Sequence, residues 1–418
     1  MVVRKKAVVA GHLCLDIFPG LGHLPPGGFK KLLQETHLLS VGPVVIATGG
    51  PVSNTGLALH KLGIPTRLVA TVGADLFGQA VREIVQSYAL ELAEDLRIDP
   101  EVNTAYTIVI SPPGEDRIFM GHPGASDTFG AGDIDYERVA QADLFHFGYP
   151  PVMRRMYSDN GAELVEIFRR VKAAGGGKLL TSLDMCFPDP RKPGGKVNWR
   201  TILSSALPYV DIFLPSFDEL MFMLHKREFK PFLHLRQTDA LLEKMTPELL
   251  HRLSDELLEM GVKVAGIKLG ARGLYLRTAG QEAFSPLAES LDIAAWSGKE
   301  LWAPCFRVQV AGTTGAGDAT IAGFLSGILR NLSPAETMKM AVAVGACDVE
   351  AVDALSGIQS WEATRQRVED GWRQYELKLE APGWKRDSES GLWSKPPEES
   401  NSQIKRRQFG RTGKLRID

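Results

Sequence analysis

The chain has 418 residues, of which 44% are hydrophobic, so it is long enough to bury a large core. A formal net charge of −2 argues against general affinity for nucleic acid or acidic membranes. The four cysteines are widely spaced and form no CxxC pair, which favours a reduced, cytoplasmic protein without a structural zinc site. No stretch is long and apolar enough to span a bilayer, and His12 and Asp16 interrupt the first apolar run too early for a secretory signal.

The first strand-like run, residues 6–15, ends at Asp16, and open α/β sheets place their ligands at strand ends. A turn-capping aspartate is the alternative for this residue. A second strand is expected at 41–48. Gly49 and Gly50 then leave bare backbone that a ligand can approach, and Asn54 offers a donor and acceptors from the first turn of a helix. This arrangement suits the recognition of hydroxyl groups.

The middle of the chain alternates strands and helices. Alternating apolar residues predict a hairpin between 104–110 and 117–120. Short apolar runs at the spacing of parallel strands follow at 144–148, 179–184 and 212–214, with a helix expected at 162–174. This βαβ pattern predicts an α/β fold with a doubly wound, mostly parallel sheet and helices on both faces. A long helical region is expected over 225–261, and a strand over 262–269.

Residues 308–329 form the stretch on which the functional interpretation depends. They read as a strand, a tight turn and a helix from about Ala319. Gly315 and Gly317 permit a turn whose N–H groups, with that of Ala316, converge on one point beside a helix N-terminus, which favours a phosphate. Asp318 lies at the same helix N-terminus, where a carboxylate is placed to accept a proton from an attacking hydroxyl. The alternative is that Asp318 only caps the helix.

A second copy of this pattern, DTFGAGD, occurs at residues 127–133. It leads into a charged amphipathic segment without small residues for close packing. We interpret it as a chance match, because short glycine motifs recur by chance.

Two separate motifs in order carry a resemblance to a known family. The first is a Gly-Gly-x-x-x-Asn segment followed by a leucine-rich helix, a glycine and a Gly-x-Asp-x-x-Gly element; the second is Gly-Ala-Gly-Asp at 315–318. The residues of the first are Gly49, Gly50, Asn54, Gly63, Gly73, Asp75 and Gly78. The chain resembles the ribokinase-like, or PfkB, family of carbohydrate kinases. The resemblance implies a ribokinase-like fold with a small β lid, formed by residues of about 12–48 and 100–125.

The resemblance also implies a reaction, in which ATP with Mg²⁺ phosphorylates a hydroxymethyl group of a sugar or sugar-like substrate. It implies that Asp318 is the general base and that the amides of Gly315, Ala316 and Gly317 form the anion hole. The implied acceptor site consists of Asp16, Gly49, Gly50 and Asn54. The implied nucleotide site consists of Lys268, Gly270, Gly273 and Thr314. Glu219 is implied to hold Mg²⁺ through water.

The chain departs from the family pattern at three places. Ser216 stands where the segment before Glu219 usually has Asn. Gly312 stands where the family has an aspartate that binds a monovalent cation, so the resemblance gives no support for potassium activation. Pro51 stands where many sugar kinases have Lys, so acceptor preference is not copied from any one relative. The alternatives are a nucleoside kinase of the same fold and a non-catalytic sugar-binding relative. A dinucleotide-dependent oxidoreductase is disfavoured, because no Gly-x-Gly-x-x-Gly follows the first strand.

The C-terminal part of the chain changes in composition. We expect a kinase domain over 1–371 and an extension over 372–418 that packs on it through Trp372, Trp384 and Trp393 and has a basic, disordered end. The expected partner is a small sugar-like molecule, with no specific nucleic acid and no membrane. An exposed lid edge favours a homodimer.

Overall fold

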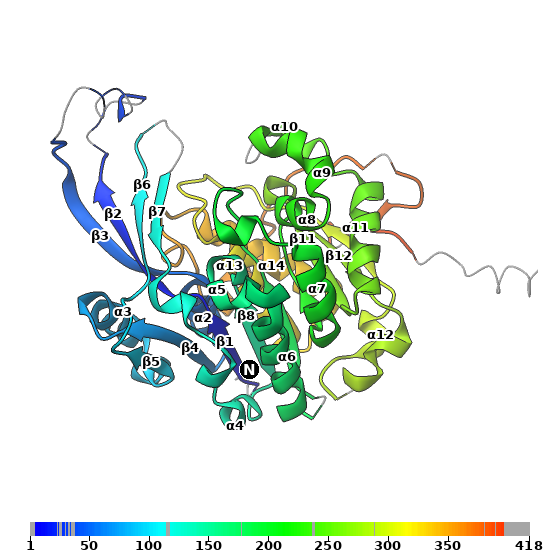
Figure 1. Cartoon of the computed structure of the whole chain (residues 1–418). Helices are drawn as coiled ribbons and strands as arrows, with labels where there is room; N and C mark the ends of the chain where they lie inside the picture. Colours follow the sequence, from blue (N-terminus) through cyan, green and yellow to red (C-terminus); the bar gives the residue numbers. More distant parts are fainter. Residues whose placement is uncertain are drawn as a thin grey trace, which may run out of the picture.

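A large sheet forms the centre of the computed structural model, which describes residues 5–22, 24, 27–29, 31, 34, 38–113, 118–176, 178–235, 239–287, 289–379, 381–388 and 390–396 (Figure 1). Within these residues its strand order is β14-β15-β13-β12-β11-β10-β9-β8-β1-β4-β5. Neighbouring strands from β11 to β5 are parallel, whereas β12 to β15 continue the sheet in antiparallel fashion. The parallel strands are β1 (Ala7–Gly11), β4 (Thr66–Gly73), β5 (Leu96–Asp99), β8 (Leu144–Gly148), β9 (Leu180–Asp184), β10 (Ile212–Phe213) and β11 (Val264–Lys268). The antiparallel strands are β12 (Leu274–Thr278), β13 (Glu300–Ala303), β14 (Lys385–Arg386) and β15 (Trp393–Ser394).

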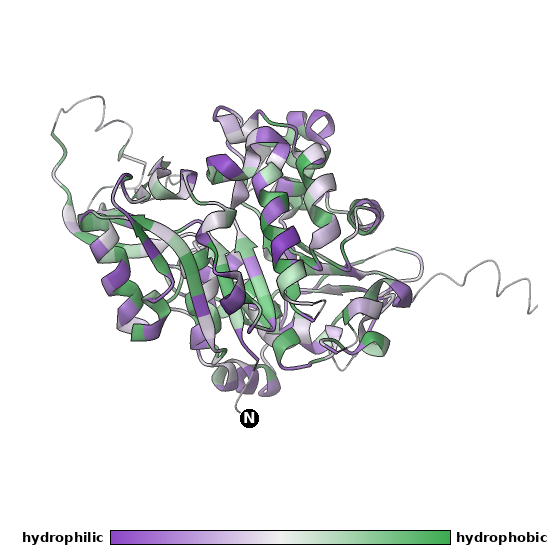
Figure 2. Ribbon diagram, turned by 60° about the horizontal axis from the view of Figure 1, so that its bottom comes forward, coloured by the Kyte–Doolittle hydropathy of each residue, from purple (hydrophilic) through white to green (hydrophobic). Residues whose placement is uncertain are grey.

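Alternate residues of the central strands enter two separate hydrophobic cores. Ala7 and Val9 of β1 belong to one core, and Val8 and Ala10 belong to the other, as expected when successive side chains point to opposite faces. Figure 2 shows green, hydrophobic strands in the middle, covered by helices that also carry purple, hydrophilic residues. The expected doubly wound sheet with helices on both faces is thereby confirmed.

The helices divide between these two cores. The first core receives α2 (Pro51–Lys61), α3 (Leu76–Tyr88), α12 (Ile293–Trp296), α13 (Ala316–Leu329), α14 (Pro334–Asp348) and α15 (Trp361–Glu369). The second receives α4 (Tyr136–Val139), α5 (Arg154–Tyr157), α6 (Ala162–Ala174), α7 (Trp199–Ala206), α8 (Phe217–Leu224), α9 (Lys226–Phe229), α10 (Asp239–Leu242) and α11 (Pro247–Glu259).

Small residues let α13 lie close to α14. A Cβ atom added at Gly323 would lie 2.9 Å from the Cα of Ala341, and one added at Gly327 would lie 2.9 Å from the side chain of Thr337. Contacts this short leave no room for larger residues on this face of α13. The close packing fixes the N-terminus of α13 in the molecule, and the candidate site is built there.

A second, smaller sheet projects from the main body as the lid (Figure 1). It consists of β2 (Cys14–Gly20), β3 (Gly42–Gly49), β6 (Tyr106–Ile110) and β7 (Ile118–His122), in the order β3-β2-β6-β7. The predicted hairpin is the antiparallel pair of β6 and β7; residue 117 of that prediction lies outside the described residues.

The strand expected at 6–15 is two strands, β1 and the start of β2, which belong to different sheets, so Asp16 lies within β2 and not at the end of a strand. Three further predicted elements differ from the structure. Residues 308–311 are not a strand; the backbone N–H groups of Arg307 and Ala311 donate to the carbonyls of Arg373 and Val349 in connecting segments, so the alternating pattern finds no strand partner. The following helix starts at Ala316 rather than near Ala319, so the turn residues already belong to its first turn.

The third is the single helical region expected over 225–261. It is broken into α9, a 3₁₀ segment (Lys230–Leu235), α10 and α11. Helix α11 has its own start, because the side chain of Thr246 accepts a hydrogen bond from the N–H of Leu249 and Pro247 occupies the first turn.

The part of the chain after residue 371 packs on the large sheet. Trp372 stacks on Phe306 with 4.5 Å between ring centroids, and β15 brings Trp393 opposite Trp302. Trp384 lies 6.4 Å from the ring of Trp302. The boundary at 371 stays a prediction, and the basic end predicted to be disordered lies outside the described residues. In the described part of the chain, none of the helices has the length and apolar character that crossing a membrane requires.

Candidate active site

The carboxylate of Asp318 is the centre of a hydrogen-bonded cluster at the N-terminus of α13. Its Oδ2 accepts hydrogen bonds from Nδ2 of Asn54 and from the hydroxyl of Tyr149, each at 2.9 Å. Its Oδ1 accepts only a longer bond of 3.4 Å from the hydroxyl of Thr55. Asp318 is 2% exposed. Burial raises the pKa of Asp318, and the bonds from Asn54, Tyr149 and Thr55 together with the charge of Lys268 oppose that rise.

The glycine turn before this carboxylate has the predicted character. Gly315 precedes the first helical residue and has a φ of 83°, which side chains other than glycine rarely adopt. A Cβ atom there would also lie 2.4 Å from the Cβ of Ala354. Ala316 and Gly317 form the first turn of α13, whose N–H groups have no partner within the helix. The turn therefore presents free donors at the mouth of a long helix.

Lys268, at the end of β11, lies beside this turn. A Cβ atom added at Gly317 would lie 3.5 Å from the Nζ of Lys268. The same Nζ donates to Oδ1 of Asp184, at the end of β9, over 2.6 Å. Burial alone would lower the pKa of Lys268, but the charges of Asp184, Glu219 and Asp318 raise it above its ordinary value. Burial raises the pKa of Asp184 to about 6 despite the charge of Lys268. Lys268 is thus a buried, protonated cation beside the predicted anion hole.

Glu219 lies in the first turn of α8 and closes a capping box. Its Oε2 accepts a hydrogen bond of 2.6 Å from the N–H of Ser216, and the hydroxyl of Ser216 accepts one from the N–H of Glu219. Burial raises the pKa of Glu219 to about 8, and the charge of Lys268 opposes the rise. One oxygen of Glu219 therefore has a helix-capping role in the structure, and its predicted contact with Mg²⁺ through water stays a prediction.

Asp16 lies on the lid side of the cluster. It belongs to β2, opposite Ala47 of β3, and a Cβ atom added at Gly49 would lie 2.2 Å from its Oδ2. Gly50 has a φ of 83° and precedes α2, the helix that carries Asn54. Gly49 thus leaves the space that the carboxylate of Asp16 occupies, whereas Gly50 leaves room for His12, whose carbonyl oxygen would lie 2.5 Å from an added Cβ atom. Burial raises the pKa of Asp16 to about 6.

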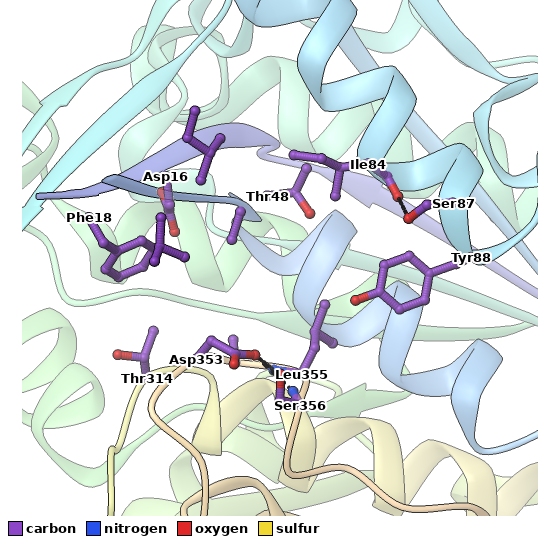
Figure 3. A pocket seen from close by; sticks show the side chains of 14 residues that line it. Asp16, Phe18, Thr48, Ile84, Ser87, Tyr88, Thr314, Asp353, Leu355 and Ser356 are labelled. Atoms are coloured by element: carbon purple, nitrogen blue, oxygen red, sulfur yellow. Dashed lines mark hydrogen bonds between the residues drawn. The ribbon is translucent and has the colours of Figure 1, made fainter. Parts of the chain in front are cut away.

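A pocket of about 450 Å³ opens between the lid and the main body. Figure 3 shows Asp16, Phe18 and Thr48 of the lid strands facing Thr314 and Asp353. The pocket lies within the size range of small-molecule sites. Of the predicted acceptor residues, Asp16 lines this pocket, and Thr314 in the segment that leads to Asp318 lines it as well.

The predicted nucleotide turn follows β11. Gly270 and Gly273 have φ values of 55° and 93°, and a Cβ atom at Gly273 would lie 2.0 Å from the carbonyl oxygen of Ala303. Gly273 is therefore required by the fold of this turn, whereas Gly270 has open space around it and is favoured by its positive φ alone. The turn lies next to Lys268. Thr314 lies instead in the pocket that holds Asp16.

Gly312 is tightly enclosed by backbone. A Cβ atom there would lie 2.8 Å from the carbonyl oxygens of both Ala351 and Val352. Nearby, Asp348 is fully buried at the end of α14, and neither of its carboxylate oxygens has a hydrogen-bond partner among the described residues. Burial, with the charges of Asp318 and Asp353, raises the pKa of Asp348 to about 8. This carboxyl group is therefore mainly protonated at neutral pH.

The second copy of the glycine motif, at residues 127–133, has a structural role. Asp133 accepts a hydrogen bond from the N–H of Gly130 and forms an ion pair with Arg97. Asp133 is the last residue of a three-residue 3₁₀ segment (Ala131–Asp133) and does not lie at the start of a long helix. The contacts of Asp133 fit our interpretation of this copy as a chance match.

The structure brings Asp318, Asn54, Lys268 and the glycine turn together, as predicted, and it adds Tyr149, Thr55 and Asp184. Asp184 ends a predicted strand, where ligands of α/β sheets lie, and this signal was available in the sequence. Thr55 follows Asn54 directly. Nothing in the sequence indicated Tyr149 as a site residue except its position directly after a predicted strand.

The described carboxylates of the site do not by themselves form a metal site. No group of three or more His, Cys, Asp or Glu side chains among the described residues is arranged to bind a metal ion. Mg²⁺ usually keeps several waters and binds through one or two carboxylates together with substrate phosphates. The buried Oδ2 of Asp184 has no hydrogen-bond partner among the described residues, and Lys268 and the α13 amides suit phosphate. The residues present therefore fit a nucleotide with Mg²⁺.

Known proteins that are similar to this chain are carbohydrate kinases. Residues 29–361 match the model of the pfkB family carbohydrate kinases. The chain is 29% identical to 2-dehydro-3-deoxygluconokinase of Bacillus subtilis over 79% of this chain and 87% of that protein. It is 24% identical to probable fructokinase-6, chloroplastic, of Arabidopsis thaliana over 86% of this chain and 82% of that protein. The structure of Arabidopsis thaliana ribokinase complexed with ribose and ATP is similar with a TM-score of 0.63 and 19% identity, covering 87% of this chain and 98% of that one.

Proposed function

The chain belongs to the pfkB family of carbohydrate kinases, and from this premise we propose that it transfers the γ-phosphoryl group of ATP to a hydroxymethyl group of a sugar or sugar-like acceptor. One observation carries the proposal. The carboxylate of Asp318 lies at the mouth of α13, bonded to Asn54, beside a cation and next to a pocket that contains Asp16. The proposed general base and anion site thus directly follow Thr314, which lines the proposed acceptor pocket.

Asp318 is the general base of this proposal. Its Oδ2 holds two short hydrogen bonds, whereas Oδ1 holds only the longer bond from Thr55. Oδ1 is therefore the oxygen available to accept the proton of the acceptor hydroxyl. The amides of Gly315, Ala316 and Gly317 stabilise the charge on the phosphoryl group in transit, which is the main task in phosphoryl transfer.

ATP supplies the phosphoryl group, and Mg²⁺ neutralises part of its charge. Lys268 would contact the phosphates, and Gly270 and Gly273 would surround the nucleotide, with Glu219 contributing to Mg²⁺ through water. Thr314 lines the pocket that holds Asp16 and is not assigned to the nucleotide. Lys268 is suited to this role because its charge is retained in a buried position. Without nucleotide, Asp184 compensates that charge.

Asp16, Gly49, Gly50 and Asn54 hold the acceptor. The buried Oδ1 of Asn54 has no hydrogen-bond partner among the described residues, so it is available to a substrate hydroxyl. Asp16 accepts hydrogen bonds from hydroxyl groups of the acceptor on the lid side. Closure of the lid would exclude water and limit ATP hydrolysis.

We propose that potassium is not required. The space in which a side chain at position 312 would lie is filled by two backbone carbonyls, and burial raises the pKa of Asp348 to about 8, which disfavours the charged form that would bind a cation. Equal turnover in potassium and in tetramethylammonium salts is the expected result.

The exposed apolar side chains of the lid support a homodimer. They lie on the two edge strands, at Val44, Val45, Ile46, Ile118, Phe119 and Met120, each at least 43% exposed. An edge strand has unpaired backbone N–H and C=O groups, which can pair with a strand of a second chain. A cytoplasmic location and the absence of nucleic-acid binding stay predictions.

The first alternative is a nucleoside kinase of the same fold, because the same motifs serve sugar and nucleoside acceptors. The second alternative is a non-catalytic sugar-binding relative. A panel of sugars and nucleosides with MgATP in a coupled ADP assay separates them, with the Asp318→Asn variant as the blank. ADP release with a sugar, absent in the variant, is expected. ADP release with nucleosides alone supports the first alternative, and sugar binding without ADP release supports the second.

A further inference from the structure

Tyr149 has a backbone conformation that is costly for its residue type. It follows β8 with φ 63° and ψ 45°, in the left-handed region. The other non-glycine residues with positive φ in the described chain are Asp159, Asn160 and Asn331, and Asp and Asn tolerate this region well. Such strain costs about 1–3 kcal/mol and persists where the surroundings impose it, often at functional sites.

Contacts on both sides hold Tyr149 in place. Its N–H donates to the carbonyl of Asp184 over 3.3 Å, at the end of the neighbouring strand. It is followed by the buried Pro150 and Pro151, and a Cβ atom at Gly194 would lie 2.4 Å from the carbonyl oxygen of Pro151. The main chain is thus fixed in the orientation that directs the phenol toward α13. The hydroxyl donates to Oδ2 of Asp318 over 2.9 Å.

This bond makes the two oxygens of Asp318 unequal. Asn54 and Tyr149 both donate to Oδ2, and only the longer bond from Thr55 reaches Oδ1. We infer that Tyr149 is a positioning residue, which with Asn54 holds Oδ2 so that Oδ1 faces the acceptor and takes its proton. The inference rests on the proposed function and extends it to a residue outside the family motifs quoted above.

The electrostatic surroundings make Tyr149 a donor only. Burial and the charges of Asp318 and Asp184 raise the pKa of its phenol well above the ordinary value, so it stays protonated. The other charged or titratable groups that face Asp318 are Lys268 of β11, Asp184 of β9, Cys186 after β9 and Asp348 of α14. A donor to a carboxylate favours its charged form. Loss of the phenol hydroxyl therefore raises the pKa of Asp318 and frees its carboxylate to rotate.

The test compares wild type, Tyr149→Phe and the control Tyr157→Phe. The ring of Tyr157 lies beside Gly194, as the carbonyl of Pro151 does, and its hydroxyl makes no hydrogen bond to Asp318. In Tyr149→Phe we expect kcat to fall about ten-fold or more with acceptor KM nearly unchanged, and the acid limb of kcat/KM to move to higher pH. Tyr157→Phe should behave as wild type. A Tyr149→Phe variant with wild-type kcat and pH profile would overturn the inference.

A second measurement does not depend on activity. The pKa of the Asp318 carboxyl, followed by carbon-13 NMR without substrate, should rise in Tyr149→Phe, and an unchanged pKa would overturn the inference even if no acceptor were phosphorylated. An inactive wild type with the expected rise would instead refute only the proposed kinase function. If Tyr149→Phe does not fold, Tyr149→Asn serves, because Asn tolerates the left-handed conformation; it should be folded, with the same rise in the pKa of Asp318.

Discussion

The Lys268→Met substitution tests whether one buried cation serves both the fold and the nucleotide. In the wild type, the Nζ of Lys268 lies 2.6 Å from Oδ1 of Asp184, and the side chains of Lys268 and Asp184 are 13% and 1% exposed. Removing one partner of a buried pair leaves an uncompensated charge and costs about 3–5 kcal/mol. We expect the free energy of unfolding to fall by this amount at about pH 8, measured by urea denaturation.

The loss should depend on pH in a defined direction. The pKa of Asp184 is already raised to about 6 in the folded state, from 3.8, and removal of Lys268 raises it further. Between the unfolded and folded pKa values the folded state binds more protons, so its stability falls as pH rises. The variant should therefore be much closer to wild type at about pH 5 than at pH 8.

Two further variants separate the roles. In the double variant Lys268→Met with Asp184→Asn, the free energy of unfolding should return most of the way to wild type and lose its pH dependence. The KM for ATP should stay raised about ten-fold or more, because a hydrogen bond to a charged group contributes about 1.5–3 kcal/mol. Lys172→Met is the matched control, because Asp211 keeps its second cation, Lys263, at 3.1 Å. Unchanged stability of Lys268→Met, or a wild-type KM for ATP in the double variant, would refute the reasoning.

Two other predictions concern Asp16 in the acceptor site and position 312, where this chain has Gly312 in place of the family's cation-binding aspartate. Because the pKa of Asp16 is raised to about 6, the acceptor KM should rise as pH falls below that value, whereas an Asp16→Asn variant should show a weak but pH-independent KM; a flat wild-type profile would contradict the role of Asp16. Gly312→Asp should lower the free energy of unfolding by about 1–3 kcal/mol through overpacking, because its Cβ would lie 2.8 Å from two backbone carbonyls. Gly280→Asp, whose Cβ meets nothing within 4 Å, should unfold like wild type in the same denaturation assay.

Local patterns predicted the elements whose signals lie within one stretch of chain. Both ends of the helix predicted at 162–174 agree with the structure, because its apolar spacing is regular and glycines follow it. The glycine turn and helix at 315–329 were recognised for a similar reason. The strand expected at 308–311 was wrong, since alternation shows that a segment can pair and does not show that a partner strand is present.

The site was predicted where single motifs carry it and missed where the fold brings separate segments together. Asn54 and Asp318 each belong to a recognisable motif, although nothing in the sequence gives their 2.9 Å contact. Tyr149 follows an ordinary buried strand, and its role depends on a backbone angle that the sequence does not reveal. Asp348 stands in a helix of small residues, and its burial depends on the close packing of α13 and α14.

The turnover number of Asp318→Asn, measured beside the dissociation constants of ATP and acceptor, tests the central claim most directly. Asparagine keeps the shape of the side chain and an oxygen that can accept from Asn54 and Tyr149, so binding should be nearly intact. Turnover should fall by about a hundred-fold or more, equivalent to ~3 kcal/mol or more of lost transition-state stabilisation. Near-normal turnover in this variant would contradict the assignment of Asp318 as the base.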